Sequence, residues 1–122
     1  MNQLSEKVAL VTGALSGLGA AVARLFADRG ASVFGIARDT DRMAAVFDGI
    51  ATRTYVSVDL TKPDECRQAV AQCVAEYGRL DVLVNVAGSH TMRHTESMTD
   101  DDWAHDLAVN LHGPFYLCHA AL

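Results

Sequence analysis

The sequence LVTGALSGLGAAVARLFADRGA, residues 10–31, constrains the fold more than any other stretch. An apolar run ends at a loop with glycines at positions 13, 17 and 19, and a helical pattern follows. Glycine permits positive φ angles and lets a ligand approach the backbone. A helix N-terminus offers free N–H groups and the positive end of its dipole to an anion. The stretch predicts a strand, a phosphate-binding loop and a helix; a tight turn that uses glycine only for packing is the alternative.

The rest of the chain alternates between short runs rich in valine and aromatics and longer helical patterns. Strands are predicted at residues 7–12, 32–37, 53–59 and 80–85, and helices at 20–29, 40–47, 61–77 and 99–118. The first and last strands are almost continuously apolar, as parallel strands covered on both faces are. This order predicts an α/β fold with a doubly wound parallel sheet and right-handed crossovers. Within the last helix, Pro114 should kink the helix or distort one turn.

Composition excludes some classes of function. The 122 residues carry a net charge of -5, which argues against a nucleic-acid partner. The sequence has no apolar run long enough to span a membrane. Its three cysteines, Cys66, Cys73 and Cys118, form no C-x-x-C pair, and the first two lie about 10.5 Å apart in helical rise, too far for a disulfide. We therefore expect a cytoplasmic protein with no nucleic-acid or membrane partner.

Four motifs in order resemble those of the short-chain dehydrogenase/reductase (SDR) family. TGALSGLG at 12–19 is similar to its T-G-x3-G-x-G loop, and DL at 59–60 falls at the end of the third strand. NVAG at 85–88 and VNLHGPF at 109–115 are similar to its N-N-A-G and V-N-x-x-G-x-F motifs. The resemblance implies one NAD(P)-binding Rossmann domain over residues 1–122 with strand order 3-2-1-4. Val86 departs from the family's second Asn, which puts that side chain's strand contacts in doubt.

The resemblance also implies roles for individual residues around a dinucleotide. Thr12 would tie the loop to neighbouring strands, and the catalytic set would include Asn110, which holds a water in a proton relay. The remaining residues would bind cofactor: Gly13, Gly17 and Gly19 at the pyrophosphate, Ser16 and Leu18 at the riboses, Asp59 and Leu60 at the adenine, and Asn85, Ala87 and Gly88 after the fourth strand.

Residues at the end of the second predicted strand indicate which cofactor, NAD or NADP, is bound. A carboxylate there would accept from a ribose 2′-OH and repel a 2′-phosphate. The corresponding position is Ala37, and Arg38 follows it with a planar donor fork suited to phosphate, with Arg42 one turn further on. This favours NADP, with NAD as the alternative. Arg38 could instead pair with a neighbouring aspartate and stay solvated.

The resemblance implies hydride transfer between nicotinamide and a carbonyl or alcohol substrate, with a Tyr as general acid/base and a Lys four residues later. No Tyr-x3-Lys occurs in the chain. We therefore expect this chain to be truncated before that motif and to be inactive by itself. Its partner would be another copy of the chain or the missing C-terminal half. A non-catalytic dinucleotide-binding or protein-interaction module is the rival reading.

The histidines suggest two further sites. His105, His112 and His119 recur every seven residues, about 10.5 Å apart in helical rise, so one metal cannot join them. We expect no metal. His90 and His94, in the loop after the fourth strand, either border substrate or belong to a solvated loop.

Overall fold

The computed structural model describes residues 2–122 and contains one parallel sheet of four strands. The strands are β1 (Val8–Thr12), β2 (Ser32–Ala37), β3 (Arg53–Ser57) and β4 (Val82–Val84). Their order is β3-β2-β1-β4, which confirms the predicted doubly wound topology. In the register, Val11 of β1 lies opposite Gly35 of β2 on one side and Val84 of β4 on the other.

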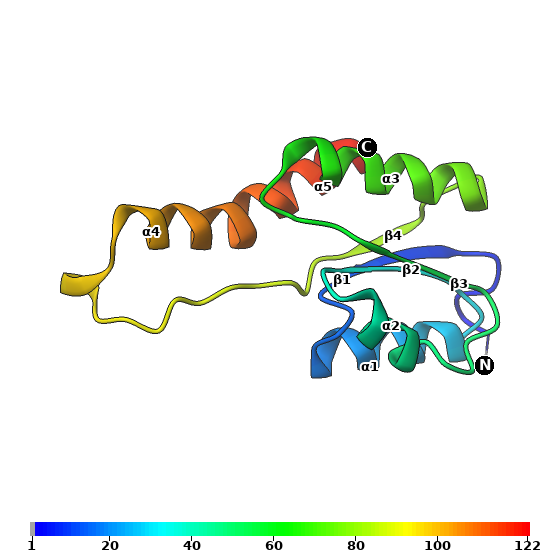
Figure 1. Cartoon of the computed structure of the whole chain (residues 1–122). Helices are drawn as coiled ribbons and strands as arrows, with labels where there is room; N and C mark the ends of the chain where they lie inside the picture. Colours follow the sequence, from blue (N-terminus) through cyan, green and yellow to red (C-terminus); the bar gives the residue numbers. More distant parts are fainter. Residues whose placement is uncertain (1) are drawn as a thin grey trace.

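Helices cover both faces of the sheet (Figure 1). The elements α1 (Gly17–Asp28) and α2 (Thr40–Val46) lie on one face, and α3 (Pro63–Tyr77) and α5 (Gly113–Ala121) lie on the other. The core beneath α1 and α2 is made by Val11, Ala14, Ala23, Ala31, Val33, Met43, Phe47 and Ile50. The core beneath α3 and α5 is made by Val8, Leu10, Phe34, Ile36, Val58, Cys66, Ala69, Val70, Cys73 and Leu117.

Two predicted helix starts are wrong. The first helix begins at Gly17, three residues early, because the Ser16 side chain accepts a hydrogen bond from the Gly19 N–H and caps it. The third begins at Pro63, and Thr61 does not cap it, because the Thr61 hydroxyl donates to Asp59 instead. The first difference brings the helix N-terminus directly to the glycine loop.

The last predicted helix is divided into three parts. An α-helix, α4 (Asp100–Leu107), is followed by a π-helical turn, η2 (Ala108–His112), and then by α5. Pro114 has no N–H to donate to the carbonyl of Asn110, so regular α-helical bonding cannot continue there. The predicted distortion at Pro114 is confirmed. A short 3-10 helix, η1 (Thr95–Ser97), precedes α4.

Candidate functional site

A cavity of about 540 Å³ lies beyond the carboxyl ends of the strands. This is the place where doubly wound sheets bind ligands. Residues at the ends of β2, β3 and β4, in the glycine loop, and in α4 and the turn after it contribute to it. The lining consists of Gly13, Ser16, Ile36, Ala37, Arg38, Val58, Asp59, Leu60, Thr61, Val86, Ala87, Gly88, Ser89, His105 and Val109.

Seven of the predicted site residues line this cavity. They are Gly13, Ser16, Arg38, Asp59, Leu60, Ala87 and Gly88. The other six lie outside the lining, and they are Thr12, Gly17, Leu18, Gly19, Asn85 and Asn110. Leu18 is 66% exposed, so its side chain is open to solvent in this conformation.

The three glycines of the loop differ in what the fold requires of them. Gly13 has a φ of 61°, and a Cβ there would lie 2.7 Å from the backbone nitrogen of Ala87. A Cβ on Gly19 would collide with the carbonyl of Gly13. By contrast, a Cβ on Gly17 would meet nothing within 4 Å, and its φ is not positive. Chain packing therefore accounts for Gly13 and Gly19 but not for Gly17.

Thr12 joins β1 to the segment that follows β4. Its hydroxyl oxygen is buried and accepts hydrogen bonds from the backbone N–H groups of Val86 and Ala87, each at 3.0 Å. Val86 thus reaches β1 through its backbone although it lacks the amide side chain of the family motif. These bonds set the distance between the glycine loop and the opposite wall of the cavity.

Asp59 is held in its ionised form at the cavity. The hydroxyl and the backbone N–H of Thr61 both donate to its Oδ1, at 2.7 and 3.0 Å. These bonds, assisted by the positive charge of Arg38, hold the pKa of the Asp59 carboxyl below its ordinary value. Within residues 2–122 no hydrogen bond reaches Oδ2.

Arg38 is an exposed cation at the rim of the same cavity. No ion pair joins it to Asp39 or Asp41 in the part of the chain that the structure describes. The Asp39 side chain instead accepts from the backbone N–H of Arg42 and caps α2. The Arg42 side chain does not line the cavity, so the structure does not bring it together with Arg38 there.

Asn110 and Asn85 each use the side-chain amide in a contact within the chain, and neither lines the cavity. Asn110 lies in the π turn, where its amide oxygen accepts from the Ser89 N–H at 2.7 Å and its amide nitrogen donates to the Ser89 carbonyl at 2.6 Å. The Asn85 side chain contacts the sulfur of Cys118 on α5 at 3.7 Å. Asn110 therefore fixes the backbone of the loop that follows β4.

Comparison with known proteins agrees with this geometry. A family model for short chain dehydrogenases matches residues 7–122. The chain belongs to the short-chain dehydrogenase family. It is 38% identical over 123 residues to D-threitol dehydrogenase of Mycolicibacterium smegmatis, covering 97% of this chain and 47% of that protein. It is 37% identical over 123 residues to 3beta-hydroxysteroid dehydrogenase of Mediterraneibacter gnavus, covering 97% and 45%.

A solved short chain dehydrogenase from Burkholderia cenocepacia, in complex with NADP, superposes with a TM-score of 0.94. It is 34% identical, and the match covers 98% of this chain and 51% of that one. This short-chain dehydrogenase chain thus spans about half the length of the relatives it matches.

The cavity of this chain also includes residues that no sequence motif predicted. Ser89 and His105 are examples, together with Val109 from the turn after α4. Ser89 directly follows the NVAG motif, and this position in the sequence could have identified it as a site residue. In the sequence, His105 stands out only as part of the repeat with His112 and His119. Within residues 2–122, no group of three or more His, Cys, Asp or Glu is placed to hold a metal ion, and no helix is long and apolar enough to cross a membrane.

Proposed function

We propose that this chain forms the NADP(H)-binding part of a short-chain oxidoreductase that transfers hydride between nicotinamide and a carbonyl or alcohol carbon. The proposal rests on the open surroundings of Gly17. The fold has no need of glycine at that position, whereas a ligand lying against the helix N-terminus does. The loop is also next to a cavity of suitable size for a nucleotide.

The residues present fit a dinucleotide. The N–H groups at the start of α1 would hold the pyrophosphate at Gly13, Gly17 and Gly19, with Ser16 and Leu18 near the riboses. Asp59, whose Oδ2 accepts no hydrogen bond from residues 2–122, would accept from the adenine amino group beside Leu60. The segment Asn85, Ala87 and Gly88 would form the opposite wall, which Thr12 holds in place. When bound, the nicotinamide supplies or accepts the hydride.

The choice of NADP over NAD rests on Arg38. An exposed guanidinium at the cavity rim, without an intrachain carboxylate partner among residues 2–122, is free to bind a 2′-phosphate. Ala37 presents no carboxylate that would repel that phosphate. The NADP complex of the Burkholderia cenocepacia relative supports this choice. NAD remains the alternative.

The substrate class is a small molecule with a hydroxyl or carbonyl group. Support comes from the names of the relatives, a D-threitol and a 3beta-hydroxysteroid dehydrogenase, which differ too much in size to specify the substrate further. Asn110 would serve the proton relay of the active site through the π turn. Because no Tyr-x3-Lys occurs in the chain, we propose that these 122 residues alone do not turn over substrate.

The chain would function with a partner that supplies the remaining site, either further residues of the same fold or a second copy. Trp103, Leu111 and Phe115 each expose more than half of their surface, which supports a contact surface on α4, the π turn and α5. Three free cysteines, two of them buried, support a reducing cytoplasmic compartment.

Thermal unfolding with and without nucleotide tests the proposal. A ligand that binds only the native state raises the melting temperature. We expect NADPH to raise it more than NADH at equal concentration, and Gly17→Ala to reduce the NADPH effect without lowering the melting temperature of the free chain. An unchanged melting temperature in millimolar NADPH would remove the basis of the proposal. Nucleotide binding without turnover, even in the presence of the partner proposed to supply the remaining site, would favour the alternative of a non-catalytic module.

A further inference from the structure

The carboxylate of Asp106 on α4 holds part of the loop between β4 and α4. Asp106 accepts a hydrogen bond from the Thr91 N–H at 3.0 Å, from the Thr91 hydroxyl at 3.1 Å and from the Ser89 hydroxyl at 3.2 Å. Ser89 in turn lines the candidate cofactor cavity. A single side chain of α4 therefore holds two residues of this loop, Ser89 and Thr91, and the first of them lines the cavity.

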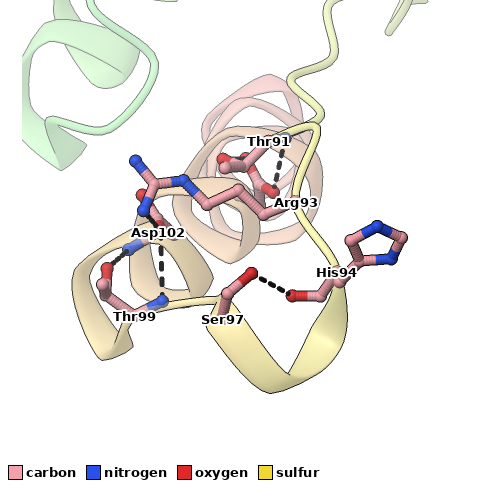
Figure 2. A network of polar contacts seen from close by, with 7 residues as sticks. Thr91, Arg93, His94, Ser97, Thr99 and Asp102 are labelled. Carbon is pink, nitrogen blue, oxygen red and sulfur yellow. Dashed lines mark hydrogen bonds and ion pairs between the residues drawn. The ribbon is translucent and has the colours of Figure 1, made fainter.

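A second carboxylate extends this attachment. Asp102 lies one helical turn before Asp106 and on the same face of α4. Its Oδ2 is 3.4 Å from the Arg93 guanidinium, and with Thr99 it forms a capping box at the start of α4 (Figure 2). The loop therefore runs antiparallel to α4. Thr91 contacts Asp106, and Arg93, further along the loop, contacts Asp102, which lies earlier in the helix.

Polar contacts rather than core packing hold this part of the chain together. None of the residues of α4 is buried. In Figure 1, α4 and the loop before it extend beyond the end of the sheet. Because α4 has no buried residue of its own, removal of the Asp106 contacts should produce a measurable change in this part of the chain.

The surroundings of Asp106 argue against a role in proton transfer. Its oxygens already accept three hydrogen bonds, and chiefly the Thr91 N–H holds the pKa of this carboxyl below its ordinary value. A carboxylate in this state is a poor base. It is instead suited to fixing the positions of its donors.

We propose that Asp106 is a positioning residue that fixes Ser89 and Thr91, and with them the wall of the cofactor cavity after β4. Its effect on cofactor affinity rests on the function proposed above. The effect on the loop does not, because all three hydrogen bonds join residues of this chain to one another. The two effects are therefore measured separately.

Amide hydrogen exchange in the free 122-residue chain tests the first effect. Breaking the bond to the Thr91 N–H should raise its exchange rate about tenfold or more in Asp106→Ala, since protection follows local opening. Asp106→Asn keeps an amide oxygen that accepts from this N–H and should retain most of the protection, and circular dichroism of both variants reports whether α4 persists. Asp101→Ala, an exposed aspartate of the same helix, should leave Thr91 unchanged. Equal exchange of the Thr91 amide in the wild type and in both Asp106 variants would overturn the proposal.

NADPH affinity tests the second effect. A wall that is no longer preorganised should weaken NADPH binding about fivefold or more in Asp106→Ala, with Asp106→Asn intermediate and Asp101→Ala equal to the wild type. If the wild type binds NADPH and Asp106→Ala binds it equally well, the role in the cavity is overturned. If the wild type binds no NADPH, the proposed function fails, and the exchange data still decide whether Asp106 positions the loop.

Discussion

Gly13 and Ala87 approach so closely that a Cβ on Gly13 would lie 2.7 Å from the backbone nitrogen of Ala87. The φ of 61° at Gly13 adds a second reason why no other residue fits. Gly13→Ala should lower the free energy of unfolding by about 2 kcal/mol or more, because it combines an unfavourable left-handed conformation with a backbone clash. Urea denaturation measures this loss.

Gly17→Ala is the matched control for that change. Alanine at this open helical position should leave stability unchanged or raise it by up to about 1 kcal/mol, because it reduces the entropy of the unfolded chain. Equal destabilisation by both variants would contradict the distinction drawn between the two glycines.

The Thr12 hydroxyl is the second connection between the glycine loop and the segment after β4. Thr12→Val leaves the partly buried N–H groups of Val86 and Ala87 without their acceptor and should cost about 2 kcal/mol of unfolding free energy. Thr12→Ser keeps the oxygen and should cost much less. A valine variant as stable as the serine variant in the same denaturation experiment would show that the two bonds contribute little.

Asp59 gives the chain a pH-dependent contribution to stability. Because Thr61 lowers the pKa of the folded-state carboxyl, ionised Asp59 stabilises the fold above the ordinary aspartate pKa, and this contribution is lost as pH falls through the lowered value. Thr61→Val should raise the Asp59 pKa toward its ordinary value, whereas Thr61→Ser should not. Carboxyl-carbon NMR titration reports the pKa directly, and a valine variant with an unshifted titration would rule out the hydroxyl as the main cause.

The three cysteines should differ in reactivity. Cys66 and Cys73 are fully buried, and burial raises the pKa of both thiols, that of Cys73 to about 11, whereas Cys118 is exposed. At pH 8, iodoacetamide should modify Cys118 first, and the other two only after unfolding. Mass spectrometry of the alkylated peptides measures the order, and rapid native labelling of Cys73 would contradict the described core.

Arg38 should decide between the two nicotinamide cofactors. Arg38→Asp removes the cation proposed to bind the 2′-phosphate and introduces a carboxylate that repels it, so NADPH affinity should fall about tenfold or more while NADH affinity holds or rises. Arg42→Asp, which makes the same charge change outside the cavity lining, should alter the NADPH-to-NADH ratio far less. Equal effects of the two substitutions on that ratio would indicate general electrostatics rather than a 2′-phosphate site.

The sheet was predictable from sequence because apolar runs and helical periodicity are local signals. The strand order 3-2-1-4 was implied by the resemblance to the SDR family, and the distortion at Pro114 by the N–H that proline lacks. The helix start predicted at Thr61 is wrong because the Thr61 hydroxyl donates to Asp59 and does not cap the helix backbone. Ser89 and Asp106 were missed because they meet only when the loop after β4 folds back along α4, a contact that no local pattern encodes.

The glycine loop of residues 13–19 is proposed to bind a dinucleotide. The most direct measurement is a 1H–15N NMR titration of the 122-residue chain with NADP+. We predict saturable shifts of the amides of residues 13–19, together with those near Asp59 and Gly88 that face the same cavity. Amides of residues 13–19 that stay unmoved at millimolar NADP+ and NAD+ would contradict the account.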